Sequence, residues 1–362
     1  MAFPPAGVVI VGGGLAGSLL ALALREQGAP VTLIDPPQTS GALSTSASAI
    51  SYGALPGWPL APSPLSRLAA GASRRWRALQ QRHGHLGWRP QALRLHGSSG
   101  RLSAISRLGV LPFAQVDTAV LMARLPLVLA AAGVQIRAAR VESLAPVAEG
   151  WELRFADGAS CRAQRVVLAA GAACRTLWPA LPERLRSSWA AVLELPACPA
   201  ALGRAAAWLP QRFLRVELER RAATLEQVDW VVDPGLVPRG SGALLGQLSL
   251  MYPGGALAQA PPLAQSEDQL RSGLAADPWG AAWAGQPGRI RQAAVAFCSG
   301  GAPLVGPVPY AEGLWLFSGF SAGFAQVPVL APLLAQRMGA APAQAGAAER
   351  RLQQLGVWPA GG

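Results

Sequence analysis

Three glycines and one acidic residue near the start of the chain have the spacing of a phosphate-binding motif followed by a ribose-binding carboxylate. Gly12, Gly14 and Gly17 form the motif G-x-G-x-x-G, and Asp35 follows about 20 residues later. The first glycine of such a motif allows a tight turn, the second lets backbone approach a pyrophosphate, and the third lets a helix pack closely on a sheet. An acid at this spacing is placed to accept hydrogen bonds from ribose hydroxyls. These residues predict a dinucleotide site.

The elements that must position this site can be predicted from the flanking sequence. Residues 8–11 are continuously apolar, a helical pattern follows up to Gly28, and a second apolar strand ends at Asp35. A helix that starts directly after the glycines offers free N–H groups and a partial positive charge to phosphates. Because strand, glycines, helix, strand and acid occur in this order, a plain tight turn is the less favoured interpretation.

Length and composition limit the protein class. The 362 residues are 51% hydrophobic and 14% charged, which excludes a disordered chain and allows a large core. We find no apolar run long enough for a membrane helix and no export signal, and the four cysteines are scattered, so we expect a reduced, cytoplasmic protein. With three histidines and no Cys/His cluster, we expect no metal site.

All 31 basic residues are arginine, which excludes chemistry that needs a lysine, namely a pyridoxal-phosphate Schiff base or a P-loop. The net charge of +12 is compatible with an anionic partner such as RNA. Because the arginines are spread along the whole chain, a nucleic-acid partner is the less favoured alternative. A small-molecule substrate is expected, and the oligomeric state is left open.

Patterns along the rest of the chain predict an α/β protein with a second, mainly antiparallel region. We expect a long loop at 36–64, a helix over 65–82, and a helix from an Asp117 cap to Ala132 that stops at Gly133. The predicted strands of the middle region are 189–195, 214–218, 230–232 and 243–250. Near the end, an apolar strand at 315–317, the turn Gly319–Gly323 and a helix to Leu334 place a second helix N-terminus where it stabilises negative charge.

Three segments together resemble the D-amino-acid oxidase family of FAD-dependent oxidoreductases, which includes glycine oxidase, sarcosine oxidase and a domain of a tRNA-modifying enzyme. They are the N-terminal motif, the run Val166–Gly171, and the run from Ala302 to Ala335, and the resemblance covers about 1–60, 117–180 and 295–340. It implies an FAD-binding, Rossmann-like domain of the glutathione-reductase type and a mainly antiparallel α+β substrate domain. We expect the FAD-binding domain to comprise 1–72, 116–186 and 291–362, and the substrate domain to comprise 73–115 and 187–290.

The resemblance also implies a set of cofactor-binding residues. They hold the pyrophosphate, the ribose, the ribityl chain, the adenine and the flavin ring, and they are Gly12, Gly14, Leu15, Ala16, Gly17, Asp35, Ser44, Ser46, Ser48, Tyr52, Gly53, Val141, Ala170, Gly171, Gly306, Gly319, Ser321, Ala322, Gly323, Phe324 and Ala325. For the three serines, ordinary loop hydrogen bonding is the competing interpretation, and for Tyr52 it is simple packing.

The sequence departs from the family where amino-acid oxidases grip a substrate carboxylate. Val295 stands where the family has an arginine, and Gly300 stands where it has an aspartate. Valine cannot replace a bidentate, charge-assisted arginine–carboxylate pair. Either another arginine serves (Arg239, Arg289 and Arg291 are nearest in sequence), or the substrate is not a simple α-amino acid. We interpret Arg239 as a turn residue.

The resemblance predicts an oxidoreductase that oxidises a C–N bond of an amine or amino-acid-like substrate by hydride transfer to flavin N5. We expect non-covalent FAD, because the stretch that carries a linking cysteine in some relatives is here Arg291–Ala294. No lysine is available to promote reaction with oxygen, so the electron acceptor is left open. Tyr252 is the candidate for orienting substrate. The alternatives are a tRNA-modifying FAD oxidoreductase and a flavin-binding protein without amine turnover.

Overall fold

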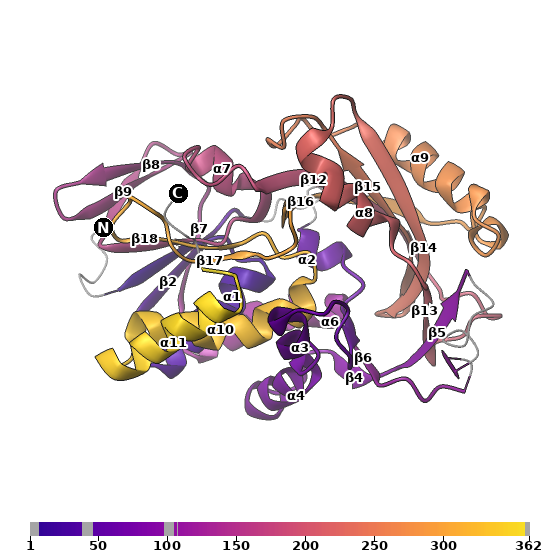
Figure 1. Ribbon diagram of the computed structural model, residues 1–362, viewed down its shortest axis with the longest axis horizontal. Helices are drawn as coiled ribbons and strands as arrows, with labels where there is room; N and C mark the ends of the chain where they lie inside the picture. Colours follow the sequence, from indigo (N-terminus) through magenta and orange to yellow (C-terminus); the bar gives the residue numbers. More distant parts are fainter. Residues whose placement is uncertain (1–6, 38–45, 98–104, 107, 359–362) are drawn as a thin grey trace.

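The computed structural model describes residues 7–37, 46–97, 105–106 and 108–358. Two six-stranded sheets dominate it, one at the left of Figure 1 and one at the right. Within the described residues, no helix is long and apolar enough to cross a membrane.

The first sheet is parallel except for one antiparallel edge strand. Its order is β17-β18-β11-β1-β2-β7, with bounds Leu304–Pro307, Leu314–Ser318, Arg165–Leu168, Val8–Val11, Val31–Asp35 and Gln135–Ala138. Strand β1 is a continuous apolar run because both of its faces are buried, whereas the edge strand β7 carries polar residues and is largely exposed. Alternate residues of β1 divide between the two faces: Val8 and Ile10 pack with helices, and Val9 and Val11 pack with the aromatic residues of a small sheet.

Helices cover one face of this sheet and an antiparallel sheet covers the other (Figure 1). The helical layer contains α1 (Leu15–Glu26), α6 (Thr118–Ala131), α10 (Gly323–Gly339) and α11 (Pro342–Gln354). The small sheet consists of β8 (Val141–Val147), β9 (Gly150–Phe155) and β10 (Ser160–Ala163). The predicted cap and stop of α6 are confirmed, because Asp117 accepts the Ala119 N–H at 3.0 Å and Gly133 has a φ of 76°.

The second large sheet is mostly antiparallel, in the order β16-β12-β15-β14-β13-β5. Its strands are Arg289–Cys298, Leu185–Leu195, Gly242–Met251, Asp229–Arg239, Ala206–Pro210 and Ala92–His96. Helix α9 (Leu263–Ala276) packs on one face, and α8 (Leu214–Arg221) packs beside the opposite face. The remaining sheet joins β3 (Ala54–Pro56), β6 (Phe113–Val116) and β4 (Trp88–Pro90). The predicted α/β class with an additional mainly antiparallel sheet is confirmed.

Three local predictions were wrong. The loop predicted over 36–64 contains a short helix at Ala47–Ile50 and the strand β3, which pairs with β6. The run 214–218 is the helix α8 and not a strand, because Arg215 pairs with Glu219 one helical turn later and Asp233 accepts the N–H groups of the first turn. The helix predicted over 65–82 is two helices, α3 (Pro64–Ala69) and α4 (Ala72–His83), separated at Gly71.

The remaining short helices are α2 (Ala47–Ile50) and α7 (Cys174–Leu177), with 3-10 turns at Gly171–Ala173, Ala222–Thr224 and Gly280–Ala282. Helix α4 packs against α10 although it lies in the predicted substrate domain, and the division into two domains stays a prediction.

Candidate functional site

The glycine turn brings α1 directly against the end of β1. Gly12 has a φ of 110°, and a Cβ there would lie 2.5 Å from the Ala169 carbonyl oxygen. A Cβ at Gly17 would overlap the Gly12 carbonyl oxygen. Only glycine allows this turn and this contact. The first turn of α1 therefore begins at the edge of the sheet, where its N–H groups have no intrahelical acceptor.

Asp35 is tied to this turn from the end of β2. Its Oδ1 accepts the Gly13 N–H at 2.7 Å. Burial raises the pKa of the Asp35 carboxyl, and the hydrogen bond from Gly13 opposes that rise. A carboxylate has two acceptor oxygens, and within the described residues Oδ2 has no hydrogen-bond partner. This oxygen is available to a ribose hydroxyl.

The predicted serines adjoin the same helix end. Ser48 Oγ accepts the Leu15 N–H at 3.0 Å, which places α2 beside the start of α1. Ser46 is the N-cap of α2 and accepts the Ala49 N–H at 3.3 Å. Each hydroxyl keeps a proton to donate to a ligand. Ser44 lies outside the described residues.

The other predicted segments gather at the same edge because carboxyl ends of parallel strands share one edge of a sheet. Ala170 and Gly171 follow β11, and Gly319 to Ala325 lead from β18 into the first turn of α10. Val141 is the first residue of β8, three residues after the end of β7. Gly306 is the exception: β17 is antiparallel, and Gly306 pairs with Leu316 in the middle of β18 and not at this edge. Ala322 is the N-cap of α10, so Gly323, Phe324 and Ala325 form its first turn.

The turn before α10 contains an unpaired polar atom. Ser321 Oγ is buried and has no hydrogen-bond partner among the described residues. The Ser321 carbonyl accepts Arg215 Nη2 at 3.1 Å, and the Phe324 carbonyl accepts the buried Trp76 indole N–H at 2.8 Å. Because a buried hydroxyl without a partner is costly, it indicates a ligand position. The glycine turn, Asp35 and this turn together fit a dinucleotide cofactor.

Tyr52 and Gly53 lie beside the second large sheet. The Tyr52 ring is buried with Leu93 and Phe113, and its hydroxyl donates to the Gly235 carbonyl at 3.2 Å. Burial, and then the charge of Asp233, raise the pKa of Tyr52. The side chain of Tyr52 therefore contributes to packing. Gly53 has a φ of 62°, and a Cβ there would overlap the Val116 carbonyl oxygen.

One face of the second sheet forms a small, mostly apolar wall where the family has its carboxylate-binding arginine. Val295 pairs with Ser188 of β12, and two residues earlier Ala293 pairs with Ala190. Val295, Ala293 and Ala190 contact Ile50 of α2 and its neighbours in one hydrophobic cluster. Gly300 follows the end of β16 and has a φ of 95°. This wall has no charge of its own.

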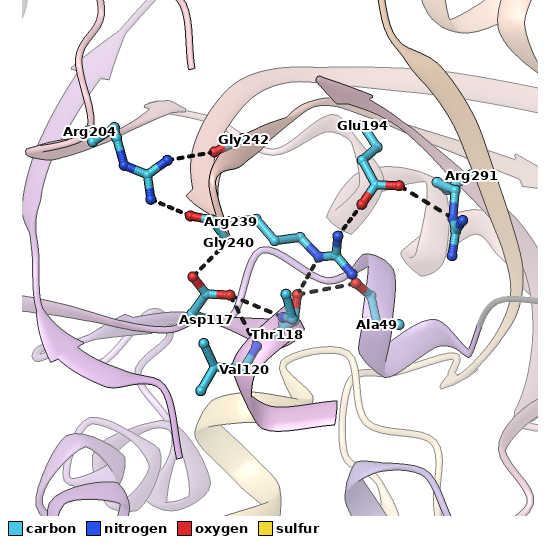
Figure 2. Close-up of polar contacts among 11 residues, drawn as sticks. Ala49, Asp117, Thr118, Val120, Glu194, Arg204, Arg239, Gly240, Gly242 and Arg291 are labelled. Atoms are coloured by element: carbon cyan, nitrogen blue, oxygen red, sulfur yellow. Dashed lines mark hydrogen bonds and ion pairs between the residues drawn. The ribbon is translucent and has the colours of Figure 1, made fainter. Parts of the chain in front are cut away.

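The candidate arginines lie farther along the same face of β16 and at the neighbouring hairpin. Glu194 of β12 pairs with both Arg239 and Arg291 (Figure 2). Arg239 Nε also donates to Thr118 Oγ1 at 3.2 Å, and Asp117 Oδ2 accepts the Gly240 N–H at 2.8 Å. Arg239 thus holds the β14–β15 hairpin against α6, as expected for a turn residue.

A buried charged cluster at α8 was not predicted from the sequence. Arg215 pairs with Glu219, and fully buried Asp233 accepts the N–H groups of Leu214 at 2.5 Å and Arg215 at 3.3 Å. Burial raises the pKa of Asp233 to about 6, although the Arg215 charge opposes this rise. The i,i+4 spacing of Arg215 and Glu219 was the available signal.

Tyr252 follows the end of β15 and is half-buried, and the described residues give its hydroxyl no hydrogen-bond partner. Its role as the substrate-orienting residue stays a prediction. In the described part of the chain, no group of three His, Cys, Asp or Glu residues is arranged to hold a metal ion.

Comparison with known proteins agrees with this geometry. The sequence model of the family described as FAD dependent oxidoreductase matches residues 7–111, which include the glycine turn, Asp35 and α2. The resemblance noted in the sequence is confirmed, and the family description agrees with the predicted enzyme class and cofactor. No curated protein sequence matches the chain.

Solved structures show the same fold over nearly the whole chain. Glycine oxidase from Geobacillus kaustophilus is 19% identical, with a TM-score of 0.63, and the match covers 91% of this chain and 92% of that one. Iminodiacetate oxidase from Chelativorans sp. BNC1 is 19% identical, with a TM-score of 0.65 and coverage of 92% and 94%. L-proline dehydrogenase from P. horikoshii is 12% identical, with a TM-score of 0.66 and coverage of 92% of both chains.

Proposed function

We propose that this chain, which resembles the FAD dependent oxidoreductases from its glycine turn to its overall fold, is a non-covalent flavoprotein that oxidises a C–N bond. The substrate is an amine or an amino-acid-like molecule. The observation that carries the proposal is the shared sheet edge, where the glycine turn, Asp35 and the start of α10 come together. The similar solved structures are those of amine and amino-acid oxidases and dehydrogenases, which supports the same class.

Named residues of the chain would hold the cofactor. The turn at Gly12–Gly17 and Ser48 would hold the pyrophosphate, and Asp35 would accept hydrogen bonds from the ribose. The start of α10 favours negative charge beside it, because the helix N-terminus carries a partial positive charge. FAD supplies the hydride acceptor when it is bound.

Ala293 and Ala190 are buried within the wall, so its half-buried residue Val295 is the one that would contact the substrate beside the reacting C–N bond. The wall would not bind a carboxylate, because its side chains carry no hydrogen-bond donor. The proposed substrate therefore has an apolar part next to the reacting bond.

An anaerobic titration of the FAD-loaded protein with a broad panel of amines tests this function. We expect at least one amine to bleach the flavin absorbance, which then returns when an electron acceptor is added. A flavin that every amine leaves oxidised would reject amine oxidation.

A second candidate is a flavin-binding protein without amine turnover, and the replacement of the family arginine by Val295 favours it. It predicts stable FAD binding together with a flavin that no amine of the panel reduces. The tRNA-modifying alternative, motivated by the net charge of +12, predicts tight tRNA binding that weakens steeply with salt.

A further inference from the structure

A hydrogen bond connects helix α8, beside the second large sheet, to the turn that leads into α10. Arg215 Nη2 donates to the Ser321 carbonyl oxygen at 3.1 Å. Ser321 directly precedes Ala322, the N-cap of α10. Arg215 therefore contacts the segment that the proposed function places beside the flavin, although it lies 106 residues away in the sequence.

Two acidic residues hold Arg215 in place. Asp233, which is fully buried on β14, accepts the backbone N–H of Arg215 at 3.3 Å and that of Leu214 at 2.5 Å. Glu219, one helical turn later, pairs with Arg215 Nη1, and the side chains of this pair are 9% and 20% exposed. Water competes little for a pair that is this well buried. The second terminal nitrogen of Arg215 thus reaches Ser321 from a fixed position.

The peptide unit between Ser321 and Ala322 is bound at both ends. Arg215 donates to its carbonyl oxygen, and Gln326 Oε1 accepts its N–H at 3.4 Å. Because a peptide unit is planar, these two contacts fix the direction in which the chain enters α10. The N–H groups of the first turn have no intrahelical acceptor, and they take their direction from this entry.

We propose that Arg215 is a positioning residue for the flavin, which aims the first N–H groups of α10 at the flavin ring through the Ser321 carbonyl. Reduction adds negative charge to the flavin, and aligned N–H groups at a helix start stabilise such charge. Arg215 thereby raises the reduction potential of bound FAD by acting on the turn and not as a ligand. This inference rests on the proposed function and deepens it, because it names a residue outside the cofactor-binding segments that controls how easily the flavin is reduced.

The reduction potential of FAD bound to Arg215→Met, measured by equilibration with a dye of known potential, tests the inference. We expect it to fall by about 30 mV or more, which corresponds to a tenfold loss of preference for reduced over oxidised FAD. Hydrogen exchange of the FAD-free variant should become faster over 319–326, because the turn loses its anchor.

Arg212→Met is the matched control for charge. Arg212 lies two residues before α8, its side chain is 75% exposed, and its partner among the described residues is Glu217. The substitution removes an equal charge from the neighbourhood of α8 without touching the turn before α10. It should leave both the reduction potential and the hydrogen exchange at their wild-type values.

A second pair of variants covers the buried carboxylate that Arg215→Met leaves without its partner. They are Glu219→Gln and the double variant Arg215→Met/Glu219→Gln, in which no charge is left unpaired between these two positions. The reduction potential of the double variant should lie below that of Glu219→Gln by about 30 mV or more.

A wild-type reduction potential in Arg215→Met, or an equal fall in Arg212→Met, would overturn the inference. A fall without faster exchange over 319–326 would also overturn it, because the charge of Arg215 alone would then explain the potential. The FAD content of each sample is measured separately. Variants that bind FAD and keep the wild-type potential contradict only the role of Arg215, whereas wild-type protein that takes up no FAD contradicts the proposed function itself.

Discussion

The substitution Gly14→Ala separates cofactor binding from folding. Gly14 has a φ of −67°, which alanine adopts freely, and an added Cβ would meet only Ser48 Oγ, at 3.4 Å. The free energy of unfolding of the FAD-free protein should therefore stay within about 1 kcal/mol of wild type. The same Cβ would occupy the surface that a pyrophosphate must approach.

The expected loss of FAD affinity follows from the loss of charge-assisted hydrogen bonds to phosphate. One such bond contributes about 1.5–3 kcal/mol, so FAD should bind roughly ten- to a hundredfold more weakly to Gly14→Ala. Quenching of tryptophan fluorescence by added FAD measures this change, and urea unfolding measures the stability.

Gly17→Ala is the matched comparison, because its Cβ would overlap the Gly12 carbonyl oxygen and force α1 away from β1. It should destabilise the FAD-free protein by about 1–3 kcal/mol. Wild-type FAD affinity in Gly14→Ala, or an equal loss of stability in the two FAD-free variants, would contradict this role of Gly14.

Three further predictions concern the residues that support the site. Burial raises the pKa of Asp233 from 3.8 to about 6, so the folded protein holds this proton more tightly than the unfolded chain, and stability should fall as pH rises from about 4 to 6. That loss is roughly 3 kcal/mol at most, and urea unfolding of Asp233→Asn over the same range should show a correspondingly smaller loss. Trp76→Phe removes the hydrogen bond to the Phe324 carbonyl and should lower the free energy of unfolding by about 1–3 kcal/mol; an unchanged urea midpoint would contradict this. Arg239→Ala should lower the free energy of unfolding by about 1 kcal/mol in the same assay. Arg291→Ala should lower it by less, because Arg239 has two partners and Arg291 has one among the described residues; the reverse order would contradict this pairing.

The N-terminal unit could be predicted from the sequence because its information is local. The apolar strands, the glycine spacing and Asp35 lie within 28 residues, and each has its own conformational requirement. The same holds for α6, whose cap and stop are read from Asp117 and Gly133. The resemblance then extended the prediction to the start of α10.

The parts that could not be predicted depend on distant partners. Leu214, Val216 and Leu218 alternate as in a strand, and the helix forms because Asp233, about 20 residues away, accepts its first N–H groups. The Tyr52 ring finds its hydrogen-bond partner in Gly235, on a different sheet. Whether an arginine is free or paired depends on Glu194 and Thr118, which sequence spacing does not place beside it.

The FAD content of the purified protein tests the central claim most directly. We expect yellow protein, or colourless protein that becomes yellow with added FAD, carrying about one FAD per chain that acid or heat releases intact. Protein that neither contains FAD nor takes it up would contradict the account, because the glycine turn, Asp35 and the start of α10 would then share an edge without holding the cofactor.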